Sequence, residues 1–195
     1  MNTNRFLNYS LKQSMNKLII RAHPKQEEWF NKAICESIYA SCMKNNHTVK
    51  IVDLYKDYQQ PFLPFSREEI PHQKEIQSLI TQADELILVF PIWWIDCPAI
   101  LKNFFDVNMA KWFGYTINKN WKEEWLLKGK KVRIVATAGW PTFFYPFIWF
   151  ISRTLGRIGY CWMKHVSTNI MAYTLKAWDS KRQRFIEKVA KRCSR

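Results

Sequence analysis

Residues 85–106 constrain the fold of this chain more than any other stretch. They open with an acidic residue and five apolar, partly β-branched residues, Glu85–Phe90, a pattern typical of a strand buried on both faces of a parallel sheet. Pro91 has no amide hydrogen, so the chain is expected to leave the sheet there. Pro98 suits the first turn of a helix, which apolar residues continue with helical spacing. This stretch therefore predicts a strand, a loop and a helix.

The loop in this unit carries two adjacent tryptophans, Trp93 and Trp94. In open α/β sheets, ligands bind just outside the carboxyl ends of the strands. The two indoles are therefore candidates for the wall of a site for a flat ligand. The alternative is that they are only core or interface aromatics.

The rest of the chain alternates between strand and helix patterns. Strands are expected at 17–22, 48–54, 86–90 and 130–136 and within 161–173. Helices are expected at 28–44, 73–82, 98–105 and 179–191, and a mixture of loop and helix at 142–158. Residues 108–128 are expected to be irregular. The alternation predicts a doubly wound five-stranded parallel sheet with helices on both faces, in a single domain over 17–195.

The first sixteen residues are polar and lack the apolar segment of a signal peptide, so we expect a flexible N-terminal extension over 1–16. No stretch is long and apolar enough to span a membrane. The five cysteines are an odd number, without a CxxC pair or the spacing of metal ligands. A reduced, cytoplasmic protein without a metal site is therefore expected.

The net charge is +14, and it is unevenly distributed. The segment 152–195 carries eleven Lys and Arg residues against two acidic residues. Such a field favours anionic partners such as nucleic acid, anionic lipid or phosphate-bearing cofactors. The alternative is a terminal helix with a basic, solvated face, because residues 181–192 also have helical spacing of apolar side chains.

The tryptophan loop and the helix after it resemble the corresponding segment of one family. The matching residues are Pro91, Trp93 and Trp94 in the loop, followed by Pro98, Ala99, Leu101, Lys102 and Asp106. This pattern is similar to that of the flavodoxin-like NAD(P)H:quinone oxidoreductases, which include DT-diaphorase and the potassium-efflux ancillary reductases. The resemblance implies a flavodoxin-like fold and a flavin, FMN or FAD, packed against Pro91, Ile92, Trp93 and Trp94.

Two further loops carry the same resemblance. His23-Pro24 and Phe30-Asn31 resemble the family's H-P-x-x-x-S-F-N loop, in which a helix N-terminus receives the flavin phosphate. This implies cofactor contacts from His23, Trp29, Phe30 and Asn31. Residues 137–140 resemble the family's T-T-G-G loop, which implies contacts from Thr137, Ala138, Gly139 and Trp140 to the polar edge of the flavin. Tyr145 lies at the spacing of the family's tyrosine, which implies a catalytic donor near the acceptor.

The resemblance implies an enzyme that transfers two electrons as a hydride from NAD(P)H, through FMN or FAD, to a quinone or similar planar acceptor. Members of this family are usually homodimers with active sites at the subunit interface. Aromatic residues of the irregular tract are candidates for that interface: Trp112, Phe113, Trp121 and Trp125.

Three departures from the family pattern favour an alternative, a flavodoxin-fold regulatory or interaction protein that has lost tight flavin binding. Glu28 stands where the phosphate loop has a hydroxyl residue, and Trp140 and Trp162 each replace a glycine. Peripheral contact with an anionic membrane, at its inner face, is a further hypothesis, because aromatic residues 143–151 lie beside two arginines. Sequence-specific nucleic-acid binding is not expected, since no helix-turn-helix, RRM or zinc spacing is present.

Overall fold

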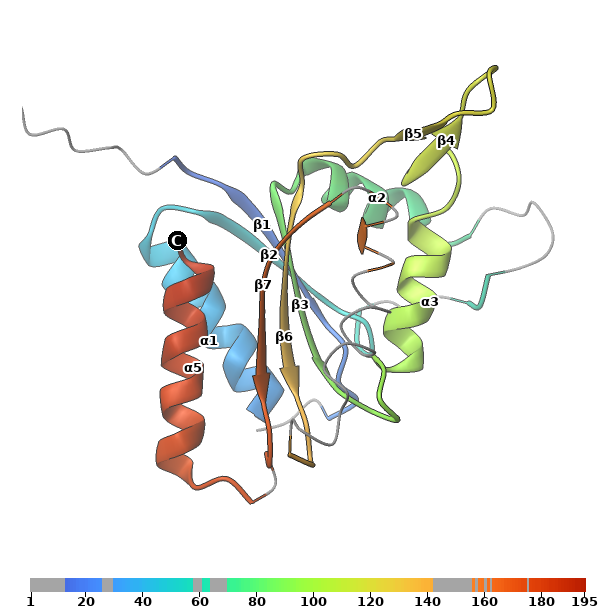
Figure 1. Cartoon of the computed structure of the whole chain (residues 1–195). Helices are drawn as coiled ribbons and strands as arrows, with labels where there is room; N and C mark the ends of the chain where they lie inside the picture. The colour runs from blue at the N-terminus through green and yellow to red at the C-terminus, as the bar shows by residue number, and fades with distance from the viewer. Residues whose placement is uncertain are drawn as a thin grey trace, which may run out of the picture.

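A five-stranded parallel sheet in the order β2-β1-β3-β6-β7 forms the centre of the computed structural model of the chain (Figure 1). The strands are β1 (Asn16–Arg21), β2 (Thr48–Asp53), β3 (Glu85–Pro91), β6 (Lys131–Thr137) and β7 (Lys164–Met171). The structure describes residues 13–25, 30–57, 61–63, 70–141, 156, 158–159, 161, 163–174 and 176–195. The predicted five-stranded parallel sheet is confirmed.

Helices cover both faces of this sheet, as predicted. α1 (Phe30–Lys44) and α5 (Asp179–Cys193) pack together on one face, and α2 (Gln73–Gln82) and α3 (Ala99–Asn108) lie over the other (Figure 1). The helices between the strands use the 3.6-residue spacing of their apolar side chains to bury one side against the sheet.

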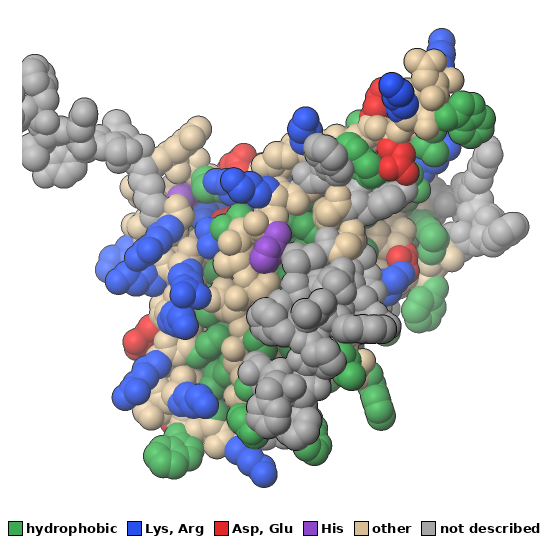
Figure 2. Space-filling model, viewed as in Figure 1, with side chains coloured by type: hydrophobic (Ala, Val, Ile, Leu, Met, Phe, Trp, Pro, Cys, Tyr) green, Lys and Arg blue, Asp and Glu red, His purple; other side chains and the backbone are tan. Residues whose placement is uncertain are grey.

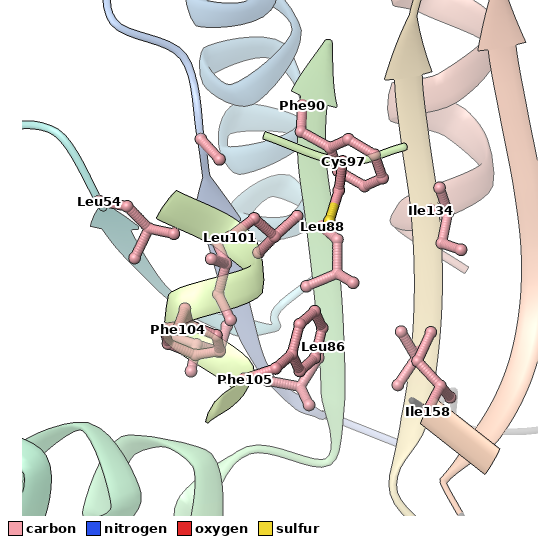
Figure 3. Close-up of a cluster of buried hydrophobic side chains, with 14 of the residues drawn as sticks. Leu54, Leu86, Leu88, Phe90, Cys97, Leu101, Phe104, Phe105, Ile134 and Ile158 are labelled. Carbon is pink, nitrogen blue, oxygen red and sulfur yellow. The ribbon is translucent and has the colours of Figure 1, made fainter. Parts of the chain in front are cut away.

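β3 is the central strand, and every one of its residues is buried. Leu86, Leu88 and Phe90 point into the cluster beneath α3, where Figure 3 shows them facing Leu101 and Phe104. The alternate residues, including Ile87 and Val89, belong to the cluster beneath α1 and α5. A strand buried on both faces needs apolar side chains at consecutive positions, which explains the unbroken pattern in the sequence.

The strand order reverses direction between β1 and β3. The chain leaves β1 for β2 on one side and leaves β3 for β6 on the other. The loops that follow β1 and β3 therefore diverge, although the strands are neighbours with Arg21 opposite Val89. Such a switch point is where doubly wound sheets open a crevice for a ligand.

Two details of the tryptophan unit differ from the predictions by one residue. Pro91 still belongs to β3, paired with Thr137. The amide of Ala22 donates to the carbonyl of Val89 on the β1 side, and the amide of Ile92 donates to the carbonyl of Thr137 on the β6 side. The nitrogen of Pro91 lies between Val89 and Ile92 and therefore faces the β1 side, at a point beyond the last paired residue of β1. No ladder hydrogen bond is lost because this nitrogen carries no hydrogen. Pro98 is the N-cap of α3 and not part of its first turn.

A small antiparallel hairpin, β4 (Tyr115–Ile117) and β5 (Glu123–Trp125), lies in the tract expected to be irregular. Its strands have three residues each, too few for a period-two pattern to be read from the sequence. All five cysteines are buried and none forms a disulfide within the described residues. Among these residues, no helix has the length and apolar character required to cross a bilayer.

Candidate functional site

The loop after β1 is held by a buried cation at the end of the strand. Arg21 is buried, pairs with Asp53 at the end of β2 and also donates a hydrogen bond to the carbonyl of Lys25. The backbone amide of Lys25 donates to Nδ1 of His23 at 3.1 Å. Because Nδ1 accepts this bond, the proton of the neutral imidazole must lie on Nε2.

His23 is uncharged at physiological pH. Its burial, together with the nearby positive charge of Arg21, lowers its pKa from 6.5 to about 4. The side chain is therefore a neutral Nε2 donor at the carboxyl end of β1. A neutral donor can bind an oxygen of a ligand without changing the charge of the site.

The tryptophan loop after β3 is a strained two-residue turn. The amides and carbonyls of Trp93 and Asp96 bond each other at 3.0 Å in both directions. The two residues between them, Trp94 and Ile95, have φ values of 49° and 61°. The left-handed region is unfavourable for a β-branched residue, and such strain tends to concentrate at functional sites.

This turn presents its indoles to the neighbouring loop and to solvent. The ring of Trp93 lies 6.4 Å from that of His23, centroid to centroid, at 54°. This contact joins the loops after β1 and β3 at the switch point of the sheet. The indole of Trp94 is 99% exposed. Both indoles are exposed, and their predicted role as the wall of a site for a flat ligand stays a prediction.

The loop after β6 is joined to both neighbouring strands. Thr137 lies opposite Pro91, and its carbonyl accepts the amide of Ile92 at 2.7 Å. The amide of Ala138 donates to Met171 at the end of β7 at 2.8 Å. These contacts bring the predicted residues Pro91, Ile92, Thr137 and Ala138 together at one edge of the sheet.

Two residues that the sequence analysis missed position this loop. The hydroxyl and the amide of Thr174 both donate to the carbonyl of Ala138, at 2.9 and 3.0 Å. The guanidinium of Arg182, from α5, donates twice to the carbonyl of Thr174. No local sequence pattern predicts these contacts, because Thr174 and Ala138 lie 36 positions apart.

The segment beyond Ala138 leaves open space. A side chain added at Gly139 would meet no atom of the described residues within 4 Å. The indole of Trp140, which replaces the second glycine of the family pattern, is 67% exposed. Among the described residues, nothing therefore fills the space in front of the backbone at Gly139.

Asn31 is the most informative polar side chain at this edge. It is fully buried, in the first turn of α1, and follows the His23 loop in the sequence. Neither its Oδ1 nor its Nδ2 has a hydrogen-bond partner within the described part of the chain. A buried amide without partners is costly to the fold, so its presence suggests a polar ligand that would satisfy it.

Of the remaining predicted site residues, Phe30 lies at the start of α1 and two lie outside the described residues. Phe30 packs against Phe185 of α5, with ring centroids 6.1 Å apart, and so contributes to the helix packing. Trp29 and Tyr145 lie outside the described residues, as do Glu28 and Trp162. Their predicted roles stay predictions.

The arrangement fits a flavin by its chemistry. Asn31 and His23 could hold the phosphate, Trp93 and Trp94 could flank the ring, and the backbone at Gly139 could face its polar edge.

Comparison with known proteins agrees with this geometry. A family model of the flavodoxin-like fold matches residues 15–193. The chain belongs to this family. An uncharacterized NAD(P)H oxidoreductase of Haemophilus influenzae is 36% identical to this flavodoxin-like protein over 134 residues. The alignment covers 64% of this chain and 65% of the relative, just under two thirds of that protein's length.

Solved structures support the same assignment. Smu.1420 from Streptococcus mutans superposes with a TM-score of 0.82 at 31% identity, over 92% of this chain and 99% of that chain. An NAD(P)H:quinone oxidoreductase from Methanothermobacter marburgensis shares the fold, with a TM-score of 0.75 at 22% identity, over 93% and 96% of the two chains. The predicted membership of a flavodoxin-like family is thereby confirmed.

Proposed function

We propose that this flavodoxin-like protein is a flavin-dependent NAD(P)H oxidoreductase that passes two electrons to a quinone or similar planar acceptor. The name of the Haemophilus influenzae relative supports the nicotinamide donor. The quinone acceptor is supported by the three loop resemblances. A bound FMN or FAD supplies the redox chemistry, taking up two electrons from NAD(P)H and releasing them to the acceptor.

The observation that carries the proposal is the buried side chain of Asn31, whose amide atoms have no partner among the described residues. It lies in the first turn of α1, where amide groups and the helix dipole favour an anion. A flavin phosphate would satisfy the amide donor of Asn31. Neutral His23 offers a second donor at the end of β1.

The other residues would orient the ring and restrict water. Trp93 and Trp94 would cover one side, while the backbone of Gly139 would face the polar edge of the ring. Thr174 and Arg182 hold that backbone in place through the carbonyl of Ala138. Hydrogen-bond donors fixed in advance are most effective where negative charge develops during reduction.

The experiment that tests this proposal is an absorbance spectrum. The purified protein is incubated with FMN or FAD, freed of excess ligand, and mixed anaerobically with NADPH or NADH, then with menadione. We expect a retained visible flavin band that bleaches with the nicotinamide and returns with the quinone. A protein that retains neither flavin would contradict the proposal.

The alternative is an interaction protein of the same fold that no longer binds flavin tightly. The observation in its favour is the exposed indole of Trp140 at a position that is glycine in the family pattern. The Trp140→Gly variant separates the two functions. Flavin retained only by this variant would favour the interaction protein, whereas equal retention would favour the enzyme.

We also infer that the protein forms a homodimer. The indoles of Trp112 and Trp121, beside and within the β4-β5 hairpin, are largely exposed in the single chain. Exposed aromatic groups of this kind are common at protein interfaces. Sedimentation velocity should show a dimer, and the Trp121→Ser variant should shift it toward the monomer; a monomeric wild type would contradict this inference. All five cysteines are buried and form no disulfide within the described residues, which agrees with a reducing compartment such as the cytoplasm.

A further inference from the structure

The exposed side of α5 carries a stripe of positive charge. Its exposed cations, named here the cationic face, are Lys181, Arg184, Lys188, Lys191 and Arg192. At about 100° per residue, all five project within an arc of about 100° around the helix axis. The buried residues Val189, Ala190 and Cys193 occupy the opposite side.

No acidic residue of α5 falls within this arc. Glu187 lies outside it by the same helical geometry and accepts a hydrogen bond from Gln183. Asp179 lies farther round the helix and pairs with Arg182. Figure 2 shows the result, in which Lys and Arg side chains gather over α5 with little negative charge among them.

The exposed faces of α1 and α3 differ from the cationic face in the charges that they place four residues apart. On α1, Lys32 pairs with Glu36, and on α3, Lys102 pairs with Asp106, both at the i,i+4 spacing that stabilises a helix. The cationic face places like charges at the same spacing, Arg184 with Lys188 and Lys188 with Arg192. Like charges at this spacing destabilise a helix, so the face works against the stability of α5.

An exposed aromatic side chain stands at one end of the cationic face. Trp178 is the N-cap residue of α5, and its indole is 82% exposed. Tryptophan prefers the boundary between water and lipid, where its ring is partly buried and its N–H remains hydrated. Lysine and arginine beside such an aromatic are typical of surfaces that lie on anionic lipid headgroups.

We propose that the cationic face and Trp178 form a docking surface for an anionic phospholipid membrane. The face is about 17 Å long and follows one side of a single helix, so Lys181, Arg184, Lys188 and Lys191 can approach a flat, negatively charged surface together. Arg192, at the end of the face, donates a hydrogen bond to Asn169 of β7. Each cation near such a surface strengthens binding by about fivefold. Base stacking on nucleic acid would instead require aromatics interleaved with the cations, and Trp178 lies at one end only.

This surface differs from the membrane contact predicted from the sequence, which was placed at residues 143–151, outside the described residues. It also does not depend on flavin binding, so it can be tested on the protein without cofactor or nicotinamide.

The test is co-sedimentation with vesicles of phosphatidylcholine, alone or with about one third phosphatidylglycerol, at low and high salt. The variant is Arg184→Gln/Lys188→Gln/Lys191→Gln. The matched control, Lys56→Gln/Lys119→Gln/Lys122→Gln, removes the same charge from exposed positions outside α5. We expect wild type to bind only the anionic vesicles, with salt sensitivity, and the α5 variant to bind on the order of a hundredfold more weakly. The control should stay within about fivefold of wild type.

A second variant tests the aromatic end of the surface. Trp178→Ala should weaken binding to the anionic vesicles by about tenfold at high salt, where the electrostatic contribution is screened. Absence of wild-type binding to anionic vesicles, or an equal loss in the control, would overturn the proposal. Tighter binding to a DNA oligonucleotide of equal phosphate concentration would also overturn it, in favour of nucleic acid.

Discussion

The two ends of the central sheet differ in how completely their buried polar groups are paired within the described residues. At the amino end, the carboxylate of Glu85 is buried between Lys17, at 2.8 Å, and Arg133. The ammonium of Lys17 also donates to the carbonyl of Cys193 at the end of α5. Nearby, His47 bonds the carbonyl of Ser194 at 3.2 Å and accepts the amide of Met15.

At the carboxyl end, Arg21 pairs with Asp53, but another buried polar group has no partner among the described residues. The amide of Asn31 is buried without a partner in the described structure, and Trp94 and Ile95 are held in a strained turn with exposed side chains. The comparison teaches that this fold pairs its buried charged groups at both ends of the sheet. Where the strands end at the switch point, it accepts strain and missing bonds, which is expected of a binding site.

The largest expected effect is at the amino end. Glu85→Gln would leave the buried cations of Lys17 and Arg133 without a counter-charge, and should lower the free energy of unfolding by about 3 to 5 kcal/mol. Urea denaturation measures the change. The control is Asp106→Asn, which breaks an exposed pair with Lys102 and should cost less than about 1 kcal/mol. Equal costs for the two variants would break the comparison.

A pH dependence is expected from His23. Its folded pKa of about 4 lies below the unfolded value of 6.5, so the unfolded chain binds a proton more readily. The contribution of His23 to stability is therefore complete above pH 6.5 and is lost as pH falls from 6.5 to 4, by about 2 to 3 kcal/mol. In urea titrations across this range, His23→Gln should show a smaller loss than wild type. Exposed His72→Gln is the control, and identical pH profiles for wild type and His23→Gln would show that the site does not hold a neutral imidazole.

Asn31 should respond in opposite directions to tests of stability and binding. Asn31→Leu removes the unpartnered amide and should leave stability unchanged or raise it by about 1 kcal/mol, while weakening FMN binding at least tenfold. Asn108→Leu is the control, because the equally buried amide of Asn108 donates to Phe104 at 2.8 Å, so this variant should lose about 1 to 3 kcal/mol. Riboflavin, which lacks the phosphate, should bind wild type and Asn31→Leu alike. A marked loss of stability in Asn31→Leu would indicate a structural role for this amide.

The smallest effect is expected in the tryptophan turn. Ile95→Gly should raise stability by about 0.5 to 1 kcal/mol, since glycine adopts a φ of 61° without the steric cost of a β-branched side chain. Ile95→Ala keeps the Cβ atom and should gain less. Thermal unfolding with and without flavin measures both. A glycine variant that is less stable than the alanine variant would show that the turn is not strained.

Much of the fold could be predicted from local patterns. The unbroken apolar residues of β3 and the spacing in α1, α2 and α5 placed these elements within about two residues, because burial on one or both faces imposes a period on the sequence. The prolines were less exact guides. Whether Pro91 ends the strand depends on which neighbour its nitrogen faces, and that is a property of the sheet.

The site divides in the same way. The loop resemblances identified His23, Trp93 and Thr137, and the structure brings these loops to one edge of the sheet. The sequence does not reveal that His23 is neutral, because its pKa depends on burial and on Arg21. Phe30 packs on Phe185 of α5, which the sequence did not reveal, and its predicted contact with cofactor stays a prediction.

The sequence by itself determined the alternation of strands and helices, the three loops with their family resemblance and the cationic spacing of α5. Only the tertiary structure decided that Lys17 meets Glu85, 68 positions away, and that Thr174 braces Ala138, 36 positions away. Side-chain periodicity is a local property that a sequence displays directly. Partners far apart in the chain depend on strand order and register, which are set only when the whole sheet assembles.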